Sequence, residues 1–354
     1  MSAKTRDLIV INILAVVAGL VAAGLMMLLL GKNPLTAYGF LFSSVMRDKY
    51  TLAEVFVKAT PLIFTGLAFA FTFKANLFNI GAQGQFYIGA LLAVASSLLL
   101  QNRAPAWLAL PVVMLLAAIG GGVWGGFIGF VKARFKANEF LVSMMSSYVA
   151  LAIMNYLLRT VLMEAKGEYP QTDALSKAVW LPTFVARTRL HYGFILAVVV
   201  ALAIWVVLYK TKFGFRVRVV GNNQEAGRLA GIDTGRIYVS AFFLSGALAG
   251  LAGFTEVNGV QHMLIQGFSP DLGAMGIGIA ILANANPIGI VFAAVLFGLL
   301  SVGGNIMGQM AGIPSSVIWL MQGFVMVFVI MAHFLRSRLE IRREKRRLRK
   351  AVEA

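Results

Sequence analysis

Long apolar runs separated by short polar segments dominate the 354-residue chain. A helix needs about 20 apolar residues to cross the roughly 30 Å hydrocarbon core of a bilayer. The run over residues 272–335 contains no Asp, Glu, Lys or Arg and is long enough for three such passages. The pattern predicts an all-α integral membrane protein with about ten transmembrane helices, at about 8–30, 56–73, 78–100, 106–131, 140–158, 191–209, 237–256, 273–284, 288–307 and 315–335.

Some of these helices are expected to be short or broken. Pro61 lies inside the second helix, and the eighth is rich in glycine and ends at the Asn284–Pro287 turn. Such segments persist inside a bilayer only where protein or a water-filled cavity covers their backbone. The first run is longer than the 7–15 apolar residues of a cleaved signal peptide, so we interpret it as a retained transmembrane helix.

The distribution of basic residues predicts the topology. The formal net charge is +17, and the basic residues lie between and after the apolar runs. With the N-terminus inside, most of the 31 Lys and Arg fall on cytoplasmic segments, which favours both termini being cytoplasmic. We therefore interpret the basic residues as topology signals and not as a nucleic-acid-binding surface. We expect one membrane domain over 1–335, a cytoplasmic segment over 210–236 within it, and a basic cytoplasmic tail over 336–354.

The sequence lacks the usual signatures of catalysis and of ATP or metal binding. It has no cysteine and no Gly-x-x-x-x-Gly-Lys-Ser/Thr motif, so we predict no catalytic residue, no metal site and no cofactor in this chain. Ion-coupled carriers place charged residues inside the membrane. Because the predicted spans are nearly free of charge, a transported solute would be uncharged and its driving energy would come from a separate ATPase.

Three segments recur in an order that is typical of one family. They read FNIGAQGQFYIGA at 78–90, GNNQEAGRLAGID at 221–233 followed by SGALAGLAG at 245–253, and GIGIAIL at 276–282 followed by PIG at 287–289. Together they resemble the ribose- and nucleoside-type (simple sugar) permeases of bacterial ABC importers, over residues 55–335. The length and the N-terminal portion are most similar to the longer permease of nucleoside importers.

The resemblance implies a permease subunit that moves a small polar uncharged solute by alternating access across the bacterial plasma (inner) membrane. It favours a nucleoside over ribose or another simple sugar. It also implies several partners: ABC ATPase subunits that carry ATP and Mg²⁺, a second permease (an unlike chain or a second copy), an extracellular or periplasmic solute-binding protein, and membrane lipid.

The cytoplasmic segment contains a predicted short helix over 225–230. Asn222 or Asn223 is suited to cap its start, and Gly231 to end it. In the resembled family this position is the coupling helix, which docks in a groove of the ATPase, whereas an ordinary amphipathic loop is the simpler alternative. The resemblance assigns ATPase coupling to Glu225, Ala226, Arg228, Leu229, Ala230 and Gly231.

Neutral amides near two span ends are candidates for the translocation path. Asn79 and Gln83 are four residues apart and would share a helix face, with Gln85 nearby. Uncharged amides donate and accept hydrogen bonds without trapping a charge, which suits a hydroxyl-rich solute. Asn284 and Asn286 are further candidates. The alternatives are helix–helix hydrogen bonding for the first three and capping of a half-helix for the last two.

Other function classes remain open at this point. A stand-alone carrier or channel is the main rival, because channels also have few intramembrane charges. A membrane-embedded enzyme would need a cluster of intramembrane polar groups, which the sequence does not show. A purely structural membrane anchor would not need ten spans with broken, glycine-rich helices.

Overall fold

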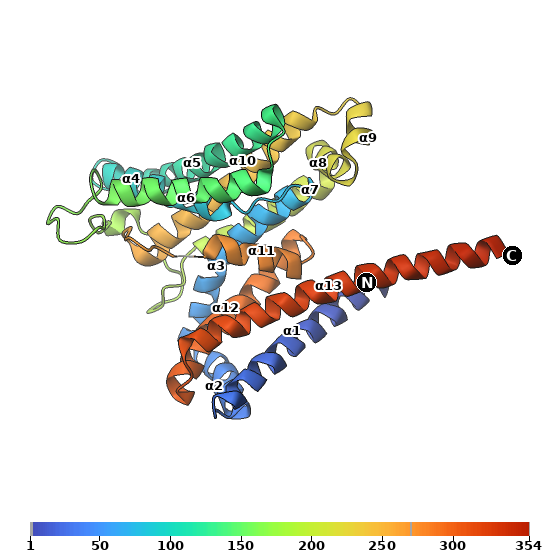
Figure 1. The fold of residues 1–354 in the computed structure, drawn as a ribbon. Coiled ribbons are helices and arrows are strands. Elements are labelled where there is room, and N and C mark those ends of the chain that lie inside the picture. The colour runs from blue at the N-terminus through green and yellow to red at the C-terminus, as the bar shows by residue number, and fades with distance from the viewer. Residues whose placement is uncertain (1–2, 270, 354) are drawn as a thin grey trace. The chain divides into compact units, whose positions relative to one another are not determined.

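The computed structural model describes residues 3–269 and 271–353, without the side chains of 3–9, 333 and 336–353. The described chain is helical and contains two isolated β-bridges but no β-strand (Figure 1). The helices are α1 Ala3–Leu29, α2 Pro34–Arg47, α3 Lys49–Phe73, α4 Ala82–Leu100, α5 Ala106–Phe135, α6 Glu139–Leu158, α7 Gly193–Lys210, α8 Lys212–Asn222, α9 Gln224–Leu229, α10 Thr234–Glu256, α11 Leu272–Leu282, α12 Pro287–Ala311 and α13 Ser315–Glu353.

The prediction of an integral membrane protein is confirmed. Within the described residues, nine helices are long and apolar enough to cross a bilayer. The short apolar helix α11 corresponds to the predicted eighth span. At about 1.5 Å per residue, its 11 residues extend about 16 Å, roughly half the hydrocarbon core. The orientation of the termini and the division into domains at 335 stay predictions. The helix of the predicted tail continues to Glu353, and its side chains lie outside the described residues.

Several predicted boundaries differ from those of the helices; the third span, for example, begins at Ala82 rather than at 78. The second span begins at Lys49 rather than at 56, and Pro61 lies inside it without ending the helix. In these first turns the carboxylate of Glu54 pairs with the guanidinium of Arg189 at 2.6 Å. The seventh span continues beyond Glu256 as one turn of π-helix over Val257–Gln261.

The chain divides into two compact units, residues 49–298 and residues 1–48 with 299–354. In the first unit, α5 and α10 pack closely against one another and both contact α4, while α6 lies along α4 (Figure 1). A Cβ atom on Gly121 would collide with the carbonyl oxygen of Gly246, and one on Gly246 with that of Gly121. The repeated glycines therefore let the two helix backbones approach closely, the packing role that the sequence favours for them.

In the second unit, α1 packs along α13, and a Cβ atom on Gly19 would lie 2.6 Å from the Cα of Val325. Helix α2 was not predicted. The Asn33 side chain caps it by accepting a hydrogen bond from the Leu35 amide at 2.9 Å, and Pro34 occupies its first turn. Its buried residues recur every four positions, at Ala37, Leu41 and Val45. With only 14 residues it is too short for a search for spans to detect.

The loop over 159–192 is folded against the end of α10. Backbone hydrogen bonds join Thr172 to Leu264, Leu175 to His262 and Leu181 to Asn258, at 2.8–2.9 Å between nitrogen and oxygen. The side chain of Asn258 also donates to the Val179 carbonyl at 2.8 Å. This ordered loop covers the end of the helix bundle opposite α8 and α9, because α7 and α10 each run from one end of the bundle to the other.

Candidate functional site

The candidate coupling segment consists of two helices, where the sequence predicted only the second. Helix α8 follows α7 directly, and the hydroxyl of Thr211 caps it by accepting from the Gly214 amide at 3.1 Å. Helix α9 begins after Asn223, whose side-chain oxygen accepts from the amides of Glu225 and Ala226, both at 3.0 Å. Of the two candidate caps, Asn223 is therefore the residue that performs this function.

The end of α9 is also fixed by a defined motif. Gly231 has φ +77°, a left-handed conformation that glycine adopts without strain. Its amide donates to the Arg228 carbonyl, and the Ile232 amide donates to the Gly227 carbonyl, both at 3.0 Å. This pair of hydrogen bonds is the Schellman arrangement that closes a helix. The predicted short helix with Gly231 as its stop is confirmed, whereas its role in coupling is not tested by this geometry.

Helix α9 presents most of its surface to the outside of the chain. Gly227 is buried, and a Cβ atom there would lie 3.3 Å from the Val220 side chain on α8. Leu229, in contrast, is 90% exposed at the helix end. An exposed leucine on a rigid, capped helix is suited to enter a groove of another protein. All six residues that the resemblance assigns to coupling are exposed: Glu225, Ala226, Arg228, Leu229, Ala230 and Gly231.

The segment is attached firmly to the helix bundle. A Cβ atom on Gly221 would collide with the carbonyl oxygen of Lys74, so the end of α8 lies directly on the turn after α3. The rings of Phe213 and Phe71 stack with centroids 6.2 Å apart. Because packed elements transmit displacement, a force applied to α9 would reach α3 through α8.

The amides predicted on the second motif divide into two groups. Asn79 and Gln85 are fully buried and bond to one another, with Asn79 Nδ2 donating to Gln85 Oε1 at 2.8 Å and Gln85 Nε2 donating to Asn79 Oδ1 at 3.2 Å. Asn79 Nδ2 also donates to the Ser245 hydroxyl at 2.8 Å, which in turn donates to the Ala68 carbonyl at 2.7 Å. We call Asn79, Gln85 and Ser245 the buried amide cluster.

The contacts of the buried amide cluster are those of helix–helix hydrogen bonding, the alternative to a place on the translocation path. Ser245 lies near the middle of α10, one of the helices long and apolar enough to span the bilayer. Polar groups at that depth must be satisfied within the protein. Both amides use their hydrogen-bonding atoms on protein partners, so neither faces an open path in this conformation. Their proposed part in translocation stays a prediction.

Gln83 has a different role, because it holds the start of the half-helix α11. Its side-chain oxygen accepts from the Gly273 amide at 2.6 Å, and its nitrogen donates to the Ser269 carbonyl at 3.3 Å. The Ser269 hydroxyl donates to the Glu256 carboxylate at 3.0 Å. Glu256 is only 3% exposed, although its place in the sequence suggested the end of a span. The sequence feature that could have marked Glu256 is its position as a single acidic residue at the end of an otherwise uncharged apolar run.

The remaining candidates, Asn284 and Asn286, are exposed at the turn between α11 and α12. The Asn286 side chain accepts from the Ile288 amide at 3.0 Å and therefore caps α12, as its alternative reading proposed. Asn284 has φ +53°, and its carbonyl accepts from the Lys74 ammonium at 3.5 Å. Lys74 thus lies at the junction of three elements: α3, the end of α8 and the α11–α12 turn.

Comparison with known proteins identifies the class of this chain. The family described as the permease component of the branched-chain amino acid transport system matches residues 51–330, most of the sequence. This chain belongs to that permease family. The permease is 33% identical to the guanosine ABC transporter permease protein NupP of Bacillus subtilis, over 94% of this chain and 96% of that protein.

Two further relatives are of similar length. The nucleoside ABC transporter permease protein NupB of Lactococcus lactis is 30% identical over 100% of this chain and 98% of its own. The glucose ABC transporter permease protein TsgB13 of Haloferax volcanii is 34% identical over 92% of this chain and 87% of its own.

The family membership fixes the general activity. The chain is the membrane-spanning permease subunit of an ABC importer and not an enzyme, because a separate ATPase hydrolyses ATP in such systems. It is a multi-pass protein of the bacterial plasma membrane. As a permease component it acts together with other subunits of its transport system.

Proposed function

We propose that this permease imports a nucleoside and that α9 transmits the ATPase movement to the membrane helices. The coupling role rests on one observation: α9 is a capped, exposed helix that α8 connects to α3. The ATPase would close on α9 with Leu229 in its groove, and α8 would pass the displacement to the turn at Lys74. The path would then open alternately to the two sides.

The choice of solute rests on the named activities of two relatives, guanosine and nucleoside transport, together with the scarcity of charge in the spans. A neutral ribose and base need hydrogen-bonding groups but no counter-charge. A simple sugar is the second candidate, because one relative of equal similarity is a glucose permease. We further propose that a second permease completes the path and that an external solute-binding protein delivers the solute.

ATP-driven uptake by the complete transporter in proteoliposomes tests the coupling role. The variant Arg228→Glu with Gly231→Asp changes the exposed face of α9, and we expect it to abolish uptake while the chain still inserts. Asp tolerates the left-handed conformation better than most residues, so the helix end should persist. Full ATP-driven uptake by this variant would refute the assignment.

A matched control exists at the end of α5, which lies on the same side of the membrane as α9 because two spans separate them. The control variant is Arg134→Glu with Lys136→Asp. Like the coupling variant, it reverses the charge of an exposed arginine and places Asp at a left-handed position, since Lys136 has φ +52°. This variant should retain most of the uptake. In the unmodified transporter, labelled guanosine should be displaced by other nucleosides. Displacement by glucose at equal or lower concentration would favour the sugar instead.

A further inference from the structure

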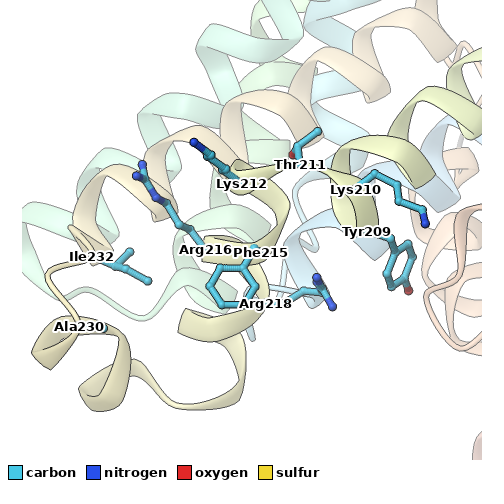
Figure 2. Close-up of a pocket in the computed structure, with 9 residues that line it drawn as sticks. All are labelled: Tyr209, Lys210, Thr211, Lys212, Phe215, Arg216, Arg218, Ala230 and Ile232. Atoms are coloured by element: carbon cyan, nitrogen blue, oxygen red, sulfur yellow. The ribbon is translucent and has the colours of Figure 1, made fainter.

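A pocket of about 550 Å³ lies where α7 meets α8, beside the chain that follows α9 (Figure 2). The last residues of the α7 span, the first half of α8 and two residues after Leu229 form its walls. The lining residues are Tyr209, Lys210, Thr211, Lys212, Phe215, Arg216, Arg218, Ala230 and Ile232.

The pocket has a strong excess of positive charge. Four of its lining residues are basic and none is acidic: Lys210, Lys212, Arg216 and Arg218. Among the described side chains, the ion pairs involve Lys132, Arg189 and Arg236, and none of the pocket's cations. The Nε atom of Arg218 is buried without a hydrogen-bond partner. The described residues that line this pocket therefore offer no carboxylate to offset its positive charge.

A second pocket also contains arginines, but there an acidic side chain of the protein offsets their charge. It measures about 460 Å³ and is lined by residues including Arg134, Arg236 and Asp233. There the Asp233 carboxylate lies 3.0 Å from Nε of Arg236, so an acidic group of the protein already accompanies the cations. The α7–α8 pocket, which we call the basic pocket, has no such acidic partner among the described residues that line it.

Aromatic rings hold two of the cations in place. The Arg218 guanidinium carbon lies 5.4 Å from the centroid of Tyr209, and the Lys210 ammonium lies 5.8 Å from that of Trp205. Burial lowers the pKa of nearby Lys74, and the charge of Arg218 lowers it further. The charge of Arg218 therefore also acts on Lys74, which lies outside the basic pocket.

We propose that the basic pocket binds the phosphate of an anionic phospholipid headgroup. Tyr209 and Lys210 are the last residues of an apolar span, which places the cations where headgroups lie. Phe215, 58% exposed, lies among them and offers an apolar surface to the start of the acyl chains. The basic pocket is concave and can receive a small anion. The partner ATPase, in contrast, would use a groove of its own to receive the protruding end of α9. Ala230 belongs both to the basic pocket and to the proposed coupling surface, so the test of the lipid site uses substitutions on α8 alone.

Native mass spectrometry of the full chain in detergent, titrated with phosphatidylglycerol or phosphatidylcholine, tests the lipid site. We expect phosphatidylglycerol to remain bound at concentrations about tenfold or more below those needed for phosphatidylcholine. Lys212→Gln with Arg216→Gln removes two exposed cations without a partner and should weaken phosphatidylglycerol binding at least about tenfold. Arg134→Gln with Lys136→Gln removes two exposed cations elsewhere on the same side and should leave it unchanged.

Equal binding of the two lipids, or an equal loss in both variants, would overturn the proposal. Glycerol 3-phosphate carries the same phosphate chemistry without acyl chains and distinguishes the source. If it displaces phosphatidylglycerol at comparable concentrations, the ligand is a soluble phosphate and the lipid assignment fails. Hydrogen exchange supplies a second readout, because phosphatidylglycerol should slow exchange at residues 230–232 in the unmodified chain but not in the Lys212→Gln, Arg216→Gln variant.

Discussion

The buried amide cluster and helix α9 use polar groups in opposite ways. Asn79, Gln85 and Ser245 are fully buried, and their side-chain amides and hydroxyl bond to protein partners that link α3, α4 and α10. The six predicted coupling residues in α9 and the turn after it are all exposed, and Leu229 is 90% exposed. The first arrangement holds helices together, whereas the second leaves binding surface for another molecule. Substitutions should therefore affect stability in the first region and coupled transport in the second.

The largest loss of stability is expected where α5 and α10 are in backbone contact. Gly246→Ala places a methyl group against the carbonyl of Gly121 and should cost about 3 kcal/mol or more, because the packed helices must separate. Thermal unfolding in detergent measures the effect. Gly323→Ala is the control, since no atom lies within 4 Å of the added carbon, and it should change stability little. Equal melting temperatures of the two variants would disprove close packing at Gly246.

A second loss should depend on pH and concerns the loop end of the bundle. His191 is 1% exposed, and burial, with a smaller effect from His262, lowers its pKa to about 4. Its ordinary pKa is about 6.5, so the unfolded chain binds more protons than the native chain between pH 6.5 and 4. Stability should be greatest above pH 6.5 and fall by up to about 3 kcal/mol as the pH drops to 4.

The melting temperature between pH 7.5 and 4.5 measures this dependence. His191→Gln removes the titrating group and should flatten the profile, even if it lowers the melting temperature at every pH through the lost hydrogen bond from the Gly193 amide, 3.1 Å in length. A profile as steep in the variant as in the unmodified chain would show that other groups carry the dependence.

The buried amide cluster should be less costly to break. Asn79→Leu removes both hydrogen bonds of the Gln85 side chain to Asn79, the bond that Ser245 accepts and the acceptor of the Gly81 amide, and it should cost about 2 kcal/mol. Gln85→Leu alone should cost a similar amount, and the double variant less than the sum, because the two amides are partners. Unfolding in detergent measures all three. Strict additivity would mean that Asn79 and Gln85 do not interact.

The smallest effect on stability is expected at helix α9. Leu229→Ala removes a side chain that is 90% exposed, so the free energy of unfolding of the isolated chain should change by less than about 0.5 kcal/mol. Binding of the partner ATPase, measured by its retention on the tagged permease, should nevertheless fall clearly. A variant that unfolds more easily would show that Leu229 packs within this chain.

Much of the fold follows from the sequence because one strong signal, a long apolar run with few or no charges, accompanies most of the spans. Both ends of α9 were also predictable, since Asn223 at its start and Gly231 after its end carry local chemistry that needs no tertiary information. Helix α2 and helix α8 were missed because both are short and polar on one side. Their caps, Asn33 and Thr211, were the available signals.

The contacts of the candidate site were less predictable. Asn79, Gln83 and Gln85 lie within seven residues, yet two of them join the buried amide cluster and one caps α11. Their partners, Ser245 and Gly273, are more than 160 residues away in sequence. Nothing local in the sequence distinguishes these roles. The basic pocket likewise depends on the tertiary packing of α7 against α8.

Cross-linking from the end of α9 tests the account most directly. The chain has no cysteine, so Leu229→Cys provides a single reactive thiol, and Phe135→Cys provides a control at an exposed apolar residue on the same side of the membrane. The complex purified from mild detergent is treated with a short thiol-to-amine cross-linker. We predict a product joining Cys at 229 to a P-loop ATPase, and little product from 135. A product from 135 with none from 229 would contradict the assignment of α9 as the coupling helix.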